Sequence, residues 1–174
     1  VGKTTSARIF ARAINGFDAN DQEDYDFNVF ELDDASNNKV EDIRSIVDQV
    51  RIPPHQGQYK VYIIDEVHML SRNAFNALLK TLEEPPEAVK FIFATTEIRK
   101  VPVTILSRCQ RYDLRRVSAD MLEAHLQKIC EQEGITYDAI ALSTIAVAAE
   151  GSVRDALSML DQAAAMTADK LVGD

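Results

Sequence analysis

Cysteine is scarce in this sequence, with only Cys109 and Cys130 among its 174 residues. Two isolated cysteines form neither a disulfide framework nor a zinc site, so we expect a protein of the reducing cytoplasm without a zinc centre. Long apolar runs are also missing, because no stretch reaches the roughly 18–20 residues that a membrane-spanning helix needs. The opening residues, Val-Gly-Lys-Thr-Thr, lack the basic and apolar segments of a signal peptide. These absences argue against a disulfide-rich secreted protein and against a membrane partner.

The formal net charge is −9, and an acidic chain is not a typical nucleic-acid binder. Hydrophobic residues make up 46% and charged residues 27%, a balance that supports a packed core. The charge is uneven, however. Residues 18–34 carry many acids and no base, whereas residues 99–116 are rich in lysine and arginine, with Asp113 as their single acid. The basic run is either a solvated face or a surface that meets phosphate or an acidic partner, and its one-sidedness favours the second interpretation.

Short apolar runs alternate with helical patterns up to about residue 117. The apolar runs predict strands at residues 29–32, 61–64 and 91–94. Apolar residues at helical spacing predict helices at residues 40–50 and 73–82. This alternation predicts an α/β fold in which helices cover a parallel sheet.

After residue 117 no strand pattern remains. Helices are predicted at residues 118–133, 137–150 and 152–166, with glycines at the breaks between them. We therefore predict two domains, an α/β core at residues 1–117 and a small three-helix domain at residues 118–174. Residues 16–28, which are mostly polar and acidic, are predicted to form a surface loop.

The segment Gly2-Lys3-Thr4-Thr5 precedes a predicted helix at residues 6–14. It matches the end of the phosphate-loop pattern, in which glycine lets the backbone approach phosphate and helix-start N–H groups point at it. Lys3 would neutralise phosphate charge and Thr4 would bind magnesium. Alone, the segment is explained equally well by an ordinary helix start. No strand pattern precedes Gly2, so we expect the chain to begin inside a domain.

The strand predicted at residues 61–64 ends in two adjacent acids, Asp65 and Glu66. Buried strands seldom end in paired acids without a cation or a partner, because desolvating charge is costly. In a phosphate-loop ATPase Asp65 would lie near magnesium and Glu66 near the water that attacks the γ-phosphate. A solvated strand end is the alternative, but together with Gly2-Lys3-Thr4-Thr5 the ATPase interpretation is preferred.

Other polar residues have weaker signals. Thr96 follows the strand predicted at residues 91–94 and could bond the γ-phosphate or the attacking water, although a simple cap explains it equally well. Arg108 is a surface charge or an arginine finger that completes a neighbour's site. Arg154 lies in the first turn of a predicted helix, where a cation opposes the helix dipole, and a phosphate partner would explain it. The histidines show no metal spacing, but His68 is close enough in sequence to Glu66 to touch the site.

Five segments carry a specific resemblance: VYIIDEVHML at 61–70, FNALLKTLEEPP at 75–86, FIFATTE at 91–97, VPVTILSRC at 101–109 and EGSVRDAL at 150–157. Together they closely resemble the family of bacterial DNA polymerase III gamma/tau subunits, which are AAA+ clamp-loader ATPases. The resemblance covers nearly the whole chain. It implies an AAA+ P-loop NTPase sheet covered by helices, followed by a helical lid domain.

The resemblance also implies a role for each candidate residue. Walker A would comprise Gly2, Lys3, Thr4 and Thr5, Walker B Asp65 and Glu66, and the sensors Thr96 and Arg154. Arg108 would be a finger that acts in trans. The implied cofactors are ATP and Mg²⁺, with Thr4 and Asp65 holding the metal.

The implied function is that of an ATP-hydrolysing motor subunit of the replication clamp loader, within the DNA polymerase III holoenzyme. Its implied partners are other clamp-loader subunits in a ring, the sliding clamp and, in the assembled complex, primed DNA.

The chain also departs from the family pattern. Residues 16–28 replace a cysteine-rich zinc module of the family, so zinc is not expected. Asp34 stands where the family usually has alanine, so it adds a charge near the expected site. The first strand, the start of the phosphate loop and the collar domain are missing from this sequence, so hydrolysis or assembly by the chain alone is not implied.

Two other functions compete with the motor. A non-hydrolysing scaffold subunit of the same ring would keep Ser107-Arg108-Cys109 while losing the Walker A lysine or threonine, and this chain has both. An AAA+ DNA-remodelling motor such as a branch-migration helicase would explain Walker A and Walker B but not Ser107-Arg108-Cys109. We therefore expect the clamp-loader motor.

Overall fold

The computed structural model describes residues 1–18, 20–32, 39–55 and 57–170 of the chain. It divides into two compact units, one spanning Gly2–Tyr112 and the other running from Asp113 onward. Asp34 lies outside the described residues. In the described part of the chain, no helix is long and apolar enough to cross a membrane.

The centre of the first unit is a three-stranded parallel sheet in the order β1-β2-β3. The strands are β1 (Val29–Leu32), β2 (Lys60–Ile64) and β3 (Val89–Phe93). Every residue of the central strand β2 is buried, as its apolar composition predicts. The register pairs Leu32 with Ile64 and Ile64 with Phe93. The three strands therefore end side by side, and whatever follows them gathers at one edge of the sheet.

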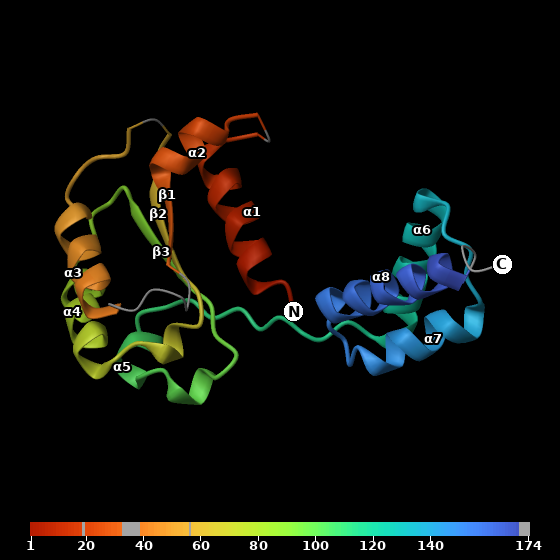
Figure 1. Ribbon diagram of the computed structural model, residues 1–174. Helices are drawn as coiled ribbons and strands as arrows, with labels where there is room; N and C mark the ends of the chain where they lie inside the picture. Colours follow the sequence, from red (N-terminus) through yellow and green to blue (C-terminus); the bar gives the residue numbers. More distant parts are fainter. Residues whose placement is uncertain (19, 33–38, 56, 171–174) are drawn as a thin grey trace. The chain divides into compact units, whose positions relative to one another are not determined.

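Helices α1 (Lys3–Asn15) and α2 (Gln22–Asn28) lie on one face of the sheet (Figure 1). Their apolar side chains pack against alternate residues of the strands in one buried cluster: Ala7, Ala11, Tyr25, Val29, Val61 and Ile63. Small alanines on the inner stripe of α1 let this helix approach the sheet closely.

Helices α3 (Lys39–Gln49), α4 (Arg72–Glu83) and α5 (Val103–Leu106) belong to the other layer (Figure 1). Their buried side chains pack against the remaining strand residues: Ile43, Ile46, Phe75, Leu78, Ile105, Tyr62 and Ile64. The aromatic rings of Phe30, Tyr62 and Phe91 stack across all three strands on this face, with centroids 5.2 and 5.5 Å apart. The sheet is thus covered on both faces, which is the arrangement a parallel sheet requires.

Two short 3-10 helices follow the strand ends. The first, η1 (Val67–Met69), follows Asp65 and Glu66 at the end of β2 and leads into α4. The second, η2 (Ile98–Lys100), comes shortly after β3 and leads into α5.

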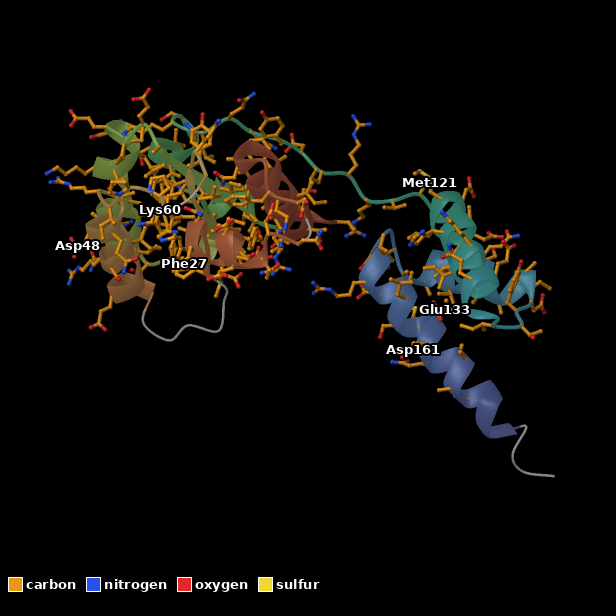
Figure 2. All side chains as sticks on the ribbon, turned by 90° about the horizontal axis from the view of Figure 1, so that it is seen from above. Phe27, Asp48, Lys60, Met121, Glu133 and Asp161 are labelled. Atoms are coloured by element: carbon orange, nitrogen blue, oxygen red, sulfur yellow. The ribbon has the colours of Figure 1, made fainter. Side chains whose placement is uncertain are left out.

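The second unit consists of α6 (Ala119–Glu133), α7 (Ala139–Ala148) and α8 (Val153–Lys170). Its core is a cluster of apolar side chains of which half are small: Leu122, Leu126, Cys130, Leu142, Ala146, Ala149, Ala156 and Leu160. Figure 2 shows Met121 and Glu133 toward opposite ends of α6 and Asp161 along α8. Burial raises the pKa of the Cys130 thiol, as for a small core residue.

The predicted fold class is confirmed, because helices cover a parallel sheet in one unit and three helices form the other. Two local predictions were wrong. Helix α1 begins at Lys3, earlier than the predicted start at residue 6. The predicted loop at residues 16–28 contains α2, whose first turn carries Glu23 and Asp24 and whose Tyr25 is buried. Acids stabilise a helix start and the buried ring anchors the turn, so an acidic composition did not prevent a helix here.

Candidate functional site

The first element of the site is the beginning of α1. Gly2 precedes the helix with φ at 77°, a left-handed conformation that favours glycine. The first intrahelical bond runs from the Ser6 N–H to the Gly2 carbonyl, at 2.8 Å. The N–H groups that come before Ser6 therefore have no partner within the helix, and no acid lies in the first turn. Together with the ammonium of Lys3, they make this helix start attractive to an anion.

The second element is the end of β2, where Asp65 follows the strand. The Asp65 N–H extends the sheet by donating to the Leu32 carbonyl at 2.9 Å. Its carboxylate accepts a hydrogen bond from the Thr4 hydroxyl through Oδ2, and one from the Glu66 N–H through Oδ1 at 2.8 Å. The predicted Walker A and Walker B residues Thr4 and Asp65 are therefore in direct contact, although 61 positions separate them.

Glu66 has an unusual backbone conformation. Its φ is 43° and its ψ 47°, in the left-handed region that residues other than glycine rarely adopt. Such strain persists only where the surroundings enforce it, and it is concentrated at functional sites. The turn directs the Glu66 side chain toward the helix start of α1 and toward the end of β3.

The Glu66 carboxylate contacts residues of three segments. The Thr96 hydroxyl and N–H donate to its Oε2 at 3.0 and 3.2 Å. The Lys3 Nζ lies 3.9 Å from its Oε1, and the His68 Nδ1 lies 3.3 Å from its Oε2. Lys3 and Glu66 are both half-buried, with 28% and 30% of their side chains exposed, so the pair is partly shielded from water and remains open to a ligand.

His68 and Thr95 form a second layer behind this carboxylate. The His68 ring is 9% exposed, and its Nδ1 lies 2.9 Å from the Thr95 hydroxyl oxygen. That oxygen also accepts the Glu97 N–H at 3.0 Å. The sequence singled out His68 only as a residue that could touch the site, and Thr95 was not among the predicted site residues. Its position next to Thr96 at the strand end was the one available clue.

The other predicted residues lie elsewhere. Thr5 is exposed in the first turn of α1. Arg108, just past α5, is bound to Glu83 rather than to the cluster around Glu66. Arg154 is exposed in the first turn of α8, in the second unit, and its part in the site stays a prediction. Cys109 is half-buried beside the core, where burial raises the pKa of its thiol, which does not suit a nucleophile.

The chemistry of this donor set fits a nucleotide with a divalent cation. The Thr4 hydroxyl and the Asp65 carboxylate supply the hard oxygen ligands that Mg²⁺ prefers, and they already converge on one another. Lys3 and the free N–H groups of α1 suit phosphate oxygens. Glu66 and Thr96 provide a carboxylate and a hydroxyl where a water molecule could be oriented.

The chain also matches two known protein families. Residues 2–118 match the family described as "DNA polymerase III, delta subunit". Residues 121–169 match the family described as "DNA polymerase III clamp loader subunit, ATPase lid domain". The two matches together cover both structural units.

Among curated proteins, the DNA polymerase III subunit tau of Bacillus subtilis is 49% identical over 183 residues, covering 98% of this chain and 32% of that protein. The corresponding subunit of Escherichia coli is 48% identical over 178 residues, covering 95% of this chain and 28% of that protein. The chain thus spans about a third or less of the length of these relatives.

Solved structures show the same fold. A DNA polymerase III gamma subunit-related protein from Thermotoga maritima has a TM-score of 0.55 at 24% identity, over 77% of this chain and 42% of that one. The RuvB Holliday junction branch migration motor of the same organism has a TM-score of 0.68 at 19% identity, over 92% of this chain and 50% of that one. By its AAA+ fold, its two family matches and its tau and gamma relatives, the chain belongs to the DNA polymerase III clamp-loader subunit family.

Proposed function

We propose that the protein to which this chain belongs is an ATP-hydrolysing motor subunit of a replication clamp loader. In this proposal it works in a ring with other clamp-loader subunits, opens a sliding clamp and places it on primed DNA. The observation that carries the proposal is the convergence of Lys3, Thr4, Asp65, Glu66 and Thr96, from three separate segments, at one edge of the sheet.

The nucleotide would bind at the start of α1. The free N–H groups and the Lys3 ammonium would hold the phosphates, while the Thr4 hydroxyl and the Asp65 carboxylate would hold Mg²⁺. The metal supplies charge neutralisation at the phosphates when bound. Gly2 and Thr5 complete the phosphate-binding segment in this proposal, and Arg154 of the second unit would approach the nucleotide as a further cation.

Turnover would depend on Glu66. Its carboxylate accepts hydrogen bonds, so it can orient a water molecule and take a proton from it during attack on the γ-phosphate. The Thr96 hydroxyl, 3.0 Å from Glu66 Oε2, would hold that carboxylate or the water in line. Lys3 contacts Glu66 in this structure. When Lys3 binds phosphate instead, this contact must break, and the Glu66 carboxylate is then free to bind water.

The site favours the motor over a scaffold subunit. A subunit that does not hydrolyse ATP has no need for a lysine, a threonine and paired acids held in contact, and this chain keeps all of them together. For the branch-migration alternative the comparison adds a fold similarity at 19% identity, whereas the tau relatives are 48–49% identical. The clamp loader is therefore the preferred setting.

Arg108 would serve a neighbouring subunit. Within its own unit it is bound to Glu83 and to the Thr104 carbonyl, away from the contacts of Glu66. In a ring its guanidinium would stabilise the charge that develops on the adjacent γ-phosphate.

A mixed ring tests this function. The full-length subunit, assembled with its partners, should load a sliding clamp on primed DNA in an ATP-dependent manner. A single Arg108→Ala subunit placed beside a wild-type ATP site should slow hydrolysis at that neighbouring site about 10³-fold and leave its own ATP binding unchanged. A loss at the mutant's own site would refute action in trans, and clamp loading without ATP would refute the motor.

A further inference from the structure

The guanidinium of Arg108 is held on one side by two neighbouring segments. Its Nη2 donates to Glu83 Oε1 at 2.8 Å, and its Nη1 donates to the Thr104 carbonyl at 2.7 Å. A longer contact of 3.4 Å joins Nη1 to the Ser107 hydroxyl. About a third of the Arg108 side chain, 34%, is exposed, so part of it still faces solvent despite these contacts.

Glu83 occupies a place that disfavours a carboxylate. It is the last residue of α4, and the C-terminus of a helix carries partial negative charge. A nearby cation stabilises a carboxylate at this position, and the Arg108 guanidinium is such a cation. The helix that carries Glu83 is anchored, because Leu78 is fully buried and Ser71 caps the start of the helix by accepting the Ala74 N–H, while the Glu83 side chain is 52% exposed.

We propose that Glu83 is a positioning residue for Arg108, which keeps the guanidinium pointed at the ATP site of the neighbouring subunit; this rests on the trans role proposed for Arg108. A free arginine side chain samples many rotamers, and the bond from Nη2 to the Glu83 carboxylate restricts them. Charge stabilisation in a transition state depends on such preorganisation, since small misplacements of a catalytic group lower rates strongly. An exposed ion pair adds little to folding stability, so the contribution of Glu83 falls on turnover.

The experiment uses the full-length subunit in its assembled ring, with the variant beside a wild-type ATP site. Glu83→Ala should lower kcat at the neighbouring site about tenfold and leave the KM for ATP there unchanged. Glu83→Gln keeps an oxygen acceptor and should restore most of that rate. The matched control is Glu84→Ala, which removes the adjacent exposed acid and should behave as wild type. The thermal unfolding midpoint should be the same for all three variants.

A double mutant separates positioning from other effects. In an Arg108→Ala background, Glu83→Ala should slow hydrolysis no further, because the group it positions is gone. An equal further loss would overturn the proposal. So would a wild-type rate for Glu83→Ala in a ring where Arg108→Ala is slow, and that result would leave the proposed function standing. If Arg108→Ala itself has the wild-type rate, the trans role fails and the role of Glu83 fails with it.

Discussion

The two units of the chain differ in how their polar side chains are used. In the first unit, Thr4 bonds Asp65 across 61 positions and Thr96 bonds Glu66 across 30. In the second unit, most side-chain hydrogen bonds are local, such as that from the Ile140 N–H to Asp138, and Arg116 with Glu150 pairs across 34 positions. Distant polar groups that converge can perform chemistry, whereas local ones mainly end helices and fix turns.

The two units also differ in how their hydrophobic cores are built. The first unit packs two clusters against the opposite faces of a sheet, so the strand ends are held rigidly where the polar residues gather. The second unit has one cluster of leucines and small residues between three helices. If this contrast is correct, polar substitutions in the first unit should change chemistry and spare stability. Core substitutions in the second unit should lower stability.

The largest effect is expected for Lys3→Ala in the full-length protein. The lysine supplies the positive charge that the phosphates need, so its loss should remove detectable ATP binding. Removal of the half-buried contact with Glu66, 3.9 Å long, should have little effect on folding. ATP binding by calorimetry and thermal unfolding without nucleotide measure both parts. Lys80→Ala, an exposed lysine on α4, is the matched control. Unchanged ATP affinity in the Lys3 variant would show that α1 does not bind phosphate.

Glu66→Gln should separate binding from turnover. The amide keeps the size and one acceptor oxygen but cannot take a proton, so hydrolysis should fall about 10³-fold while ATP binding stays nearly unchanged. Single-turnover hydrolysis in the assembled ring measures this. Glu97→Gln, which alters an exposed acid outside the cluster, should retain the wild-type rate. Wild-type turnover in the Glu66 variant would remove Glu66 from the mechanism.

Much of this contrast was visible in the sequence. Apolar runs predicted the three strands, and acids or hydroxyls directly after two of them predicted a polar edge, because parallel strands end together. Helix α2 could not be predicted. Its acids suit a helix start as well as a loop, and the contacts that favour the helix cannot be inferred from the local sequence: Tyr25 donates to Glu31 at 3.1 Å and lies 4.1 Å from the Arg12 guanidinium.

Side-chain partners were the least predictable part of the site. The contact of His68 with Thr95 depends on the left-handed turn at Glu66, and no sequence pattern predicts that turn. The pairing of Arg108 with Glu83 spans 25 positions and depends on how α4 and α5 end beside one another. Secondary structure follows local patterns, whereas these pairs follow from tertiary packing.

In the second unit, Leu126→Ala should lower the free energy of unfolding by about 3 kcal/mol. Leu126 is fully buried at the centre of the three-helix cluster, and truncation leaves a cavity. Met121→Ala on the same helix removes a side chain that is 66% exposed and should change stability by less than about 0.5 kcal/mol. Denaturant unfolding of the isolated chain measures both. Equal effects of the two substitutions would contradict the packing role given to this unit.

The smallest effect is expected for Tyr62→Phe, and it tests the first unit as a packed sheet. The Tyr62 ring is fully buried, and its hydroxyl has no hydrogen-bond partner among the described residues. Removal of a buried, unpaired hydroxyl should leave the protein as stable as wild type or more stable by up to about 1 kcal/mol at pH 8.

The substitution should also change how the free energy of unfolding depends on pH. Burial raises the pKa of Tyr62 to about 12 in the folded protein, from an ordinary value of 10.0. Between these two values the unfolded chain loses the proton while the folded chain retains it, so ionisation of the unfolded state lowers the wild-type free energy of unfolding as pH rises. This part of the decline is absent in Tyr62→Phe. Tyr25, whose pKa is also raised to about 12 by burial, contributes equally to both proteins. Denaturant unfolding at pH 8 and pH 11 should therefore show a smaller loss of stability in the variant. Equal losses would mean that the Tyr62 hydroxyl is hydrated in the folded state and that the sheet is less tightly covered on this face.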